Sequence, residues 1–303
     1  MTAADIRFAC PVCAADLEAQ AEDRRRCVSC GSTYERRDGV WRFLTPDRAA
    51  ALEPFIRQYR AVRDRDGHRR PSPPEFYRLL PNVERDDPHA AEWLVRRETY
   101  HHLLQHVLAS GPQPGRVLDL GAGTAWLSHR LAALGHLVVA VDIIDDELDG
   151  LGASRHYAPP FVAVQADFDA LPFAPAQFDL VVFNGSLHYA HDAAATLAGA
   201  HRMLAAGGAL VVMDSPFFAA PEAGAAMVDE KLRRFAADLG VAGAVRGGDG
   251  YLTFARLRAV AEALDLQPQF VPSRGSWLWR VKRQIGRLRL GRAPAAFGLW
   301  VAR

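Results

Sequence analysis

The sequence predicts an α/β fold, in which a Rossmann-like, mostly parallel sheet follows a small metal-binding module. Short apolar runs alternate with helical patterns along the second half of the chain, and a glycine turn follows one of these runs at 121–123. All four cysteines lie in two close pairs near the N-terminal end. Strands that alternate with helices form a parallel sheet that helices cover on both faces.

The pattern of residues 116–142 predicts a strand, a glycine turn, a helix and a second strand. The first run, 117–120, is apolar and partly β-branched, as buried parallel strands are. Gly121 and Gly123 permit a tight turn and a close approach of the backbone to a ligand. Apolar residues at helical spacing then predict a helix over 126–134. Ligands of open α/β sheets bind at such a turn, at the carboxyl ends of the strands.

The second strand, 137–141, ends at Asp142, where sheets of this type place a carboxylate that binds the hydroxyls of a ribose. A dinucleotide site requires a glycine-lined helix N-terminus under a pyrophosphate, but this loop begins with Asp119 and has Ala125 at the third glycine position. An anion fits poorly beside Asp119, whereas a cationic amino acid group fits well. We therefore expect a nucleoside cofactor with an amino acid group. The alternative is another doubly wound domain that binds NAD or no ligand.

The residues Asp119 to Gly123 resemble motif I, Asp-x-Gly-x-Gly, of the class I S-adenosylmethionine-dependent methyltransferases. Two later stretches resemble later motifs of this family: AVQADFDALPFAPAQFDLVVFNGSLHYAHD at 163–192 and MLAAGGALVVMD at 203–214. The resemblance covers roughly residues 85 to 303. It implies S-adenosylmethionine as the cofactor and a seven-stranded sheet of order 3-2-1-4-5-7-6 with an antiparallel last strand.

The resemblance also implies site residues, with Asp142 at the ribose and Asp167 at the adenine. The expected cofactor-binding set is Asp119, Gly121, Ala122, Gly123, Asp142, Ile143, Asp167, Phe168 and Asn184. The remaining elements of this domain are expected as strands near 161–165, 178–183, 209–213, 269–271 and 297–302, helices over 221–239 and 253–264, and a glycine-rich loop at 243–250.

Methyl transfer asks the protein mainly to hold the acceptor in line with the S–CH₃ bond in a dry pocket, so a general base is optional. His188 is the residue that we predict as the base, because the resembled small-molecule enzymes often have a histidine after the fourth strand. Packing or substrate orientation is an equally weighted role for His188. Asp214 and Asn184, each at a strand end, are lesser candidates.

The four cysteines form the pairs Cys10-Pro-Val-Cys13 and Cys27-Val-Ser-Cys30. Two turns that each present two thiolates are typical of a structural zinc ribbon. Two disulfides or a redox pair are the alternatives, and neither fits a cytosolic chain without a thioredoxin-like context. The module resembles zinc ribbons in front of some methyltransferases, including a ribosomal-RNA guanine methyltransferase family. That family has a histidine in its last ligand pair, so Cys30 departs from it and RNA as substrate does not carry over.

The chain of 303 residues has a formal net charge of +1, so its charge as a whole argues neither for nor against nucleic acid. We expect a zinc ribbon over 1–45, a helical linker or cap over 46–110 and the S-adenosylmethionine-binding domain over 111–303. The linker has helical patterns at 52–62 and 90–109, separated by a charged, proline-rich break. The N-terminus has no signal-peptide pattern, which favours a cytoplasmic protein.

Residues 274–292 contain seven basic residues and no acidic one. Leu278, Val281, Ile285 and Leu288 recur at helical spacing, so a helix here has one apolar stripe. Three interpretations remain. The first and most favoured is a charged surface over a stripe packed in the core. The second is a docking surface for an anionic or lipid-like substrate or a membrane. The third is an RNA-binding surface, which ranks last because the global charge is near neutral.

These patterns together predict methyl transfer from S-adenosylmethionine to a small-molecule acceptor. An RNA-modifying methyltransferase that uses the ribbon to hold RNA is one alternative, weakened because the chain lacks an Asn-Pro-Pro-Tyr or Asp-Pro-Pro-Tyr motif. A non-catalytic cofactor-binding protein that acts through partners is the other.

Overall fold

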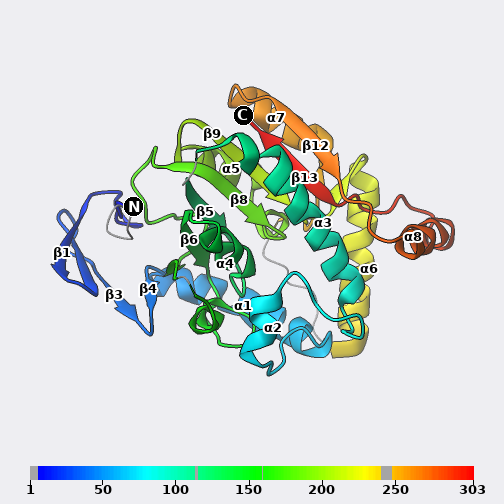
Figure 1. The fold of residues 1–303 in the computed structure, drawn as a ribbon, viewed down its shortest axis with the longest axis horizontal. Helices are drawn as coiled ribbons and strands as arrows, with labels where there is room; N and C mark the ends of the chain where they lie inside the picture. The colour runs from blue at the N-terminus through cyan, green and yellow to red at the C-terminus, as the bar shows by residue number, and fades with distance from the viewer. Residues whose placement is uncertain (1–5, 113–114, 159, 240–247) are drawn as a thin grey trace.

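The computed structural model describes residues 6–112, 115–158, 160–239 and 248–303. Figure 1 shows a twisted central sheet with helices on both sides. Within these ranges the main sheet has eleven strands, in the order β1-β2-β3-β4-β7-β6-β5-β8-β9-β13-β12. The glycine-rich loop expected at 243–250 lies mostly outside the described residues.

The strands are β1 (Leu17–Ala21), β2 (Arg24–Cys27), β3 (Thr33–Arg37), β4 (Val40–Arg42), β5 (Arg116–Leu120), β6 (Leu137–Asp142), β7 (Val162–Gln165), β8 (Phe178–Asn184), β9 (Leu204–Met213), β12 (Pro268–Pro272) and β13 (Gly298–Ala302), with the short parallel pair β10 (Phe217–Phe218) and β11 (Leu252–Thr253) outside the main sheet. The α-helices are α1 (Pro46–Arg65), α2 (Pro74–Leu79), α3 (Ala90–His106), α4 (Trp126–Ala133), α5 (Ala193–His201), α6 (Pro221–Leu239), α7 (Phe254–Ala263) and α8 (Trp277–Leu290).

The strands from β7 to β12 form the class I methyltransferase sheet. Numbered along the chain from β5, they have the order 3-2-1-4-5-7-6, and β13 runs antiparallel to both β9 and β12. This confirms the expected order and the expected antiparallel last strand. Both faces are buried: Leu118 packs in the core with α5 and α7, whereas its neighbour Val117 packs in the core with α3 and α4. Burial on both faces explains why these strands are continuous apolar runs.

The N-terminal strands extend this sheet. β4 pairs in parallel with β7, with Trp41 opposite Val164. Phe8 stacks on Phe43 and on Phe173, with ring centroids 5.0 and 5.7 Å away, so the ribbon and the main sheet share one apolar core. The domain boundary expected at residue 45 stays a prediction, but it does not coincide with a gap in the sheet or in the core.

Helices α1, α2 and α3 connect the ribbon to the sheet and confirm the helical patterns expected at 52–62 and 90–109. α1 begins at its N-cap Thr45 and ends at Arg65, where the charged, proline-rich break begins. These helices position the side chains that cover the carboxyl ends of β5 and β6, as the cavity below shows. No described helix is both long and apolar enough to cross a bilayer.

Helix α8 corrects the most favoured interpretation of residues 274–292. The helix forms as expected, with Ser276 as its N-cap, but its apolar stripe is not packed in the core. The side chains of Leu278, Val281 and Ile285 are all exposed. In Figure 1, α8 projects from the body of the molecule beside α6.

Candidate active site

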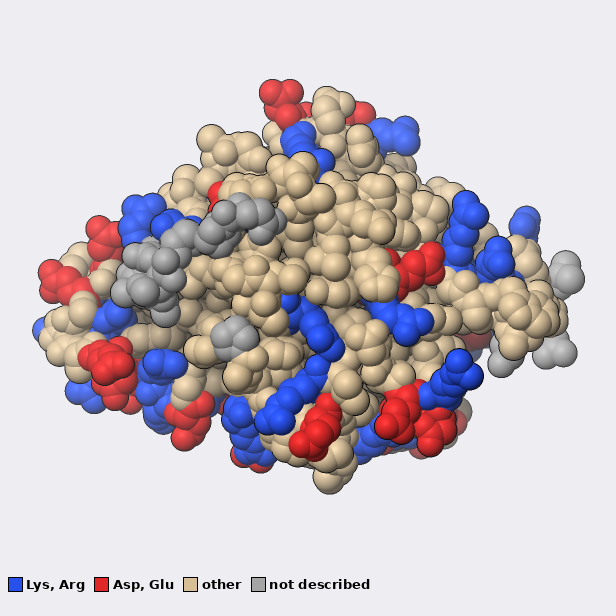
Figure 2. Space-filling view, viewed as in Figure 1, with Lys and Arg blue, Asp and Glu red and all other residues tan. Residues whose placement is uncertain are grey.

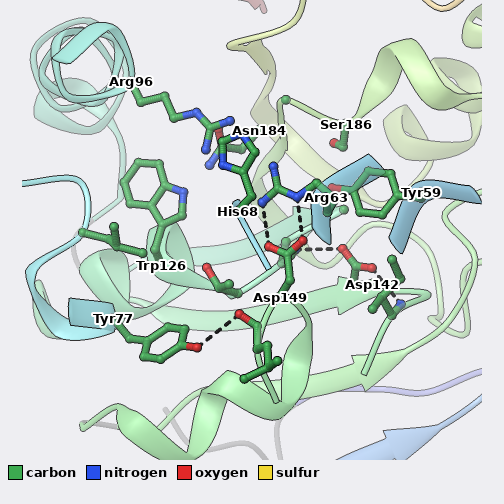
Figure 3. A pocket seen from close by; sticks show the side chains of 18 of the residues that line it. Tyr59, Arg63, His68, Tyr77, Arg96, Trp126, Asp142, Asp149, Asn184 and Ser186 are labelled. Carbon is green, nitrogen blue, oxygen red and sulfur yellow. Dashed lines mark hydrogen bonds and ion pairs between the residues drawn. The ribbon is translucent and has the colours of Figure 1, made fainter. Parts of the chain in front are cut away.

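Two neighbouring cavities lie at the carboxyl ends of the parallel strands. We call the first the glycine-loop cavity. Its floor comes from 121–124, 142–144 and 184–186, which follow β5, β6 and β8. Side chains from the covering segments close it, and Figure 3 shows several of them pointing inward: Tyr59, Arg63, His68, Tyr77 and Arg96.

The glycine loop has a backbone that only glycine tolerates at its first position. Gly121 has a φ of +73°, and a Cβ there would lie 2.3 Å from the Cβ of Ser186. The Ser186 hydroxyl donates to the carbonyl of Leu120 at 2.5 Å, which fixes the two strand ends together. The loop therefore presents main chain to the cavity without side chains in the way.

Asp142 lies at the edge of this loop. Its carboxylate accepts hydrogen bonds from the backbone N–H groups of Gly123 at 2.7 Å and Ile144 at 2.8 Å. Burial nevertheless raises the pKa of Asp142 to about 6. The sequence placed a ribose-binding carboxylate at this position, and the structure places it in the cavity wall, held in one orientation.

Asp149 is a second carboxylate in the wall, which the sequence reasoning missed. It is buried and accepts two hydrogen bonds of 2.6 Å from the Arg63 guanidinium of α1. Figure 3 shows this pair above Asp142. The acidic run that follows β6, IDDELDG, was the only sequence signal for it. The pair ties α1 across the top of the cavity.

Six other expected cofactor residues line the glycine-loop cavity: Gly121, Ala122, Gly123, Ile143, Phe168 and Asn184. The cavity encloses about 140 Å³. Ligand pockets usually measure about 300–1,000 Å³. The polar groups of the cavity fit a nucleoside with an amino acid group. Because the cavity is smaller than such pockets usually are, the cover formed by Arg63 and the neighbouring segment would have to move outward to admit this ligand.

Asp119 does not line the cavity. It is completely buried behind the glycine loop, where one carboxylate oxygen accepts from the Ser128 hydroxyl at 2.7 Å. The other oxygen has no hydrogen-bond partner in the described part of the chain. Burial raises the pKa of Asp119 to about 7. Its position is that of a buried support beneath the loop.

Asp167 is also absent from the wall of the glycine-loop cavity. Its carboxylate pairs with Arg48 of α1 at 2.5 Å and accepts from the backbone N–H of Asp169 at 3.1 Å. The side chain faces a neighbouring cavity between α1 and α5, and Phe55 and Phe168 line both that cavity and the glycine-loop cavity. An adenine contact through Asp167 stays a prediction.

The second large cavity, which we call the basic cavity, encloses about 560 Å³. It shares six lining residues with the glycine-loop cavity: Tyr59, Arg63, His68, Arg96, Gly185 and Tyr189. Further cations come from α6, α8 and the segment after α8: Lys231, Arg283, Arg287 and Arg292. Arg292 pairs with Glu230 at 2.7 Å. Arg96, Lys231 and Arg287 have no ion pair with any described carboxylate.

His188 and Asp214 lie in the wall of the basic cavity rather than at the glycine loop. His188 Nδ1 is 3.2 Å from the Ser215 hydroxyl. Burial, together with the charges of Lys231 and Arg96, lowers the pKa of His188 to about 3. Asp214 accepts from the Thr99 hydroxyl at 2.7 Å, and burial raises the pKa of Asp214 to about 6.

The four cysteines come together at the far edge of the sheet, with all four Sγ atoms within 4.8 Å of one another. The Cys10–Cys30 and Cys13–Cys27 Sγ pairs are 3.6 and 3.4 Å apart. Thiolates on one tetrahedral zinc ion lie about 3.8 Å apart, whereas a disulfide requires about 2.05 Å. The backbone N–H of Cys30 also points to Cys27 Sγ at 3.4 Å. This arrangement is compatible with one metal ion.

The sequence reasoning missed the cations that the covering helices supply. Arg63 and Arg96 lie in helices for which no motif was found, and only the folded structure brings them to the strand ends. His101, His102 and His106, in the C-terminal part of α3, line neither cavity.

Comparisons with known proteins agree with this geometry. Residues 118–212 match the family model described as a methyltransferase domain. A demethylmenaquinone methyltransferase of Mycobacterium sp. (strain KMS) is 41% identical over 107 residues, which are 35% of this chain and 44% of that protein. A malonyl-[acyl-carrier protein] O-methyltransferase of Methylococcus capsulatus is 33% identical over 118 residues, 38% of this chain and 43% of that protein.

The chain thus spans less than half the length of these curated relatives. The structure is similar to a crystal structure of magnesium protoporphyrin IX methyltransferase from Synechocystis PCC 6803 with bound S-adenosylhomocysteine. The TM-score is 0.50 and the identity 14%, and the match covers 84% of this chain and 99% of that one. This likeness and the strand order agree on the class I methyltransferase fold.

Proposed function

We propose that this protein transfers a methyl group from S-adenosylmethionine to a small-molecule acceptor. The observation that carries the proposal is the pair of adjoining cavities: a glycine loop with a fixed carboxylate in one, and an acceptor-sized space in the other. The match of residues 118–212 to a methyltransferase domain supports it.

The cofactor supplies a methyl group that its sulfonium already activates, and the residues of the glycine-loop cavity would hold it. Asp142 would accept hydrogen bonds from the ribose hydroxyls, and the glycine loop would let the backbone approach the amino acid part. Phe168 and Asn184 complete the wall. Arg63 would exchange its contact with Asp149 for an outward position when the cavity fills.

The acceptor would occupy the basic cavity. Arg96 lines both cavities, so it lies where the two substrates meet, and Lys231 and Arg287 lie farther out. Cations without carboxylate partners favour an acceptor that carries a negative charge. The main task of the cavity is to orient the acceptor and exclude water, which is enough for methyl transfer from a sulfonium.

If the acceptor must lose a proton, Asp214 suits that role better than His188. A general base works best with a pKa near the working pH. The pKa of Asp214 is about 6, whereas that of His188 is about 3. His188, fixed by Ser215, is better suited to orient the acceptor as a neutral imidazole. This reverses the order of candidates that the sequence suggested.

The test is to incubate the protein with methyl-labelled S-adenosylmethionine and a cell extract, and then to separate small molecules, RNA and protein. We expect label in the small-molecule fraction with wild type and none with Asp142→Ala. Label in RNA would establish the RNA-modifying alternative. If the protein binds S-adenosylmethionine but labels no fraction, the non-catalytic alternative gains support.

We also propose that Cys10, Cys13, Cys27 and Cys30 bind one structural zinc ion. The four sulfur atoms all lie within 4.8 Å of one another, which supports this proposal. A closed set of four thiolates leaves no open coordination position for catalysis.

A further inference from the structure

We propose that α8 docks this protein on the surface of an anionic phospholipid membrane, with the basic cavity beside the docked helix. The docking itself does not depend on the proposed methyl transfer. Only the role given to the cavity rests on that function.

The outer side of α8 is an apolar stripe that no described residue covers. We define the outer stripe as Trp277, Leu278, Val281 and Ile285, whose exposed fractions are 64, 53, 45 and 44%. Residues three and four apart lie on the same face of a helix, so the last three form one continuous strip. Most large apolar side chains that this structure exposes lie on α8. A contiguous exposed apolar patch marks an interaction site.

The inner side of α8 contacts the body of the protein through Arg283, which orients the stripe. The Arg283 guanidinium lies over the Trp279 ring at 4.2 Å and over the Phe297 ring at 5.8 Å. The same guanidinium donates to the carbonyl of Ala295, and Ser276 caps the helix through the backbone N–H of Trp279. The stripe therefore faces solvent because the other face of the helix is held against the body.

The charge of this segment is of one sign. Residues 274–292 carry seven basic residues and no acidic one, while the whole chain has a formal net charge of +1, which leaves −6 for the rest. Arg274, Arg280 and Arg287 are exposed in the segment. Figure 2 shows blue side chains beside tan ones at the projecting end where Figure 1 places α8. An apolar stripe flanked by arginine and lysine, with a tryptophan at one end, is the composition that an anionic lipid surface binds.

A second copy of this chain fits the stripe less well. In a two-fold contact each patch meets itself, so two segments of charge +7 would lie face to face and repel. RNA also fits less well, because three of the four side chains of the outer stripe are aliphatic and only Trp277 is aromatic, whereas RNA-binding surfaces use aromatic stacking and basic contacts. An anionic lipid surface is the partner that can bind both the apolar side chains of the stripe and the basic side chains beside it.

Docking through this face would place the basic cavity next to the docked helix, on the side of α8 that faces away from the outer stripe. Arg283, Gly286, Arg287 and Leu290 belong both to α8 and to the cavity wall. The cavity therefore borders the same helix that carries the outer stripe. An acceptor with an anionic head and an apolar body, held at the bilayer surface, would then lie about one helix diameter from the cavity.

The test uses full-length protein and vesicles of phosphatidylglycerol mixed with phosphatidylcholine, with pure phosphatidylcholine vesicles as the charge control. Binding is measured by co-sedimentation. We expect wild type to bind the anionic vesicles and to lose binding at high salt. The double variant Leu278→Glu with Ile285→Glu removes the stripe, and Arg274→Glu with Arg280→Glu reverses two exposed charges outside the cavity. Each should weaken binding about thirtyfold or more.

Two variants at other exposed sites are the matched controls. Leu134→Glu places a charge at another exposed leucine, and Arg233→Glu with Arg258→Glu reverses two exposed arginines elsewhere. Both should bind vesicles like wild type. Circular dichroism and S-adenosylhomocysteine binding check that every variant is folded. If wild type fails to bind S-adenosylhomocysteine but binds vesicles, the proposed function fails and the docking proposal stands.

Three results would overturn the docking proposal. The first is wild type that ignores anionic vesicles or binds pure phosphatidylcholine equally well. The second is a dimer, seen by sedimentation equilibrium, that Leu278→Glu with Ile285→Glu dissociates while no vesicle binding occurs. The third is RNA binding that Arg274→Glu with Arg280→Glu abolishes while vesicle binding is unaffected or absent.

Discussion

The two cavities meet along six shared residues but are built in different ways. The floor of the glycine-loop cavity comes from the ends of three neighbouring strands, and the carboxylates in its wall are those of Asp142 and Asp149. The basic cavity is built from side chains of α1, α3, α6 and α8, and its unpaired groups are cations such as Arg96 and Lys231. A site made from main chain and strand ends follows from local sequence, whereas a site made from side chains of distant helices follows only from the fold.

This difference predicts that unfolding of the zinc ribbon disturbs the glycine-loop cavity before it disturbs the basic cavity. Arg42 of β4 contacts Asp145 and the side chain of Gln165, and Gln165 donates to the carbonyl of Ile143 at 3.2 Å. The substitution Cys27→Ser should remove the zinc and lower the free energy of unfolding by more than about 3 kcal/mol, because in small modules metal binding supplies folding free energy.

Elemental analysis measures the loss of zinc and thermal unfolding measures the loss of stability. Calorimetry with S-adenosylhomocysteine measures the change in cofactor affinity. The sequence alone predicts that cofactor binding survives zinc loss largely intact. The Arg42 contacts instead predict a loss of affinity of a few fold. Freshly purified, reduced wild type without zinc would refute the metal site. Unchanged cofactor affinity in zinc-free protein would show that the ribbon and the cavity are independent.

The substitution Asp142→Ala should weaken S-adenosylhomocysteine binding by about 1.5–3 kcal/mol, roughly 10- to 150-fold, through loss of charge-assisted hydrogen bonds to the ribose. Calorimetry measures this, and Arg280→Glu, outside both cavities, is the control that should bind normally. If NADH bound tightly and competed with S-adenosylhomocysteine, the site would be a dinucleotide-binding site and the methyltransferase interpretation would be wrong.

The sequence predicted the sheet and the glycine loop because each depends on local rules, whereas the strand order came from the resemblance to the class I methyltransferases. Apolar strands that are buried on both faces are visible as runs, and Gly121 is required by a positive φ and by the nearness of Ser186. The residue roles stay predictions, because they depend on contacts that the sequence does not show. Asp119 and Asp167 have the expected positions in the chain, but the first is buried behind the loop and the second is paired with Arg48.

The basic cavity and the exposure of α8 could not be predicted for a different reason. Arg96 has no local pattern that distinguishes it from a surface arginine, and only the packing of α3 brings it to the strand ends. The spacing of Leu278, Val281 and Ile285 shows that they share one face, but not whether that face meets the core or solvent. Such properties depend on contacts between segments that are far apart in the chain.

The pH dependence of cofactor binding sharpens the contrast between the cavities. Burial raises the pKa of Asp142 to about 6, and the ionised form is the one that accepts hydrogen bonds from a ribose. Affinity for S-adenosylhomocysteine should therefore rise as the pH rises through 6, and should be about tenfold lower at pH 5 than at pH 7.5. The variant Asp142→Asn should bind weakly at both values. A wild-type affinity that does not change between pH 5 and 7.5 would contradict this assignment.

The smallest expected effect concerns His188 in the basic cavity. Burial and the charges of Lys231 and Arg96 lower the pKa of His188 to about 3, so its imidazole should stay neutral from pH 5 to pH 8. Carbon-13 NMR of the labelled imidazole measures this without knowledge of the acceptor, with His188→Gln to assign the signal. In that variant S-adenosylhomocysteine binding should be unchanged, because His188 does not line the glycine-loop cavity.

A signal that titrates near pH 6.5 would instead restore His188 as a general base. An anion in the basic cavity would offset part of the positive charge around the imidazole and raise the pKa of His188. Repeating the titration with inorganic phosphate should therefore shift the midpoint of the His188 titration upward. The pH dependence of S-adenosylhomocysteine binding, which reflects Asp142, should not change. This difference between the two titrations would show that the cation-lined space and the carboxylate-lined space respond to ligands separately, although they share a wall.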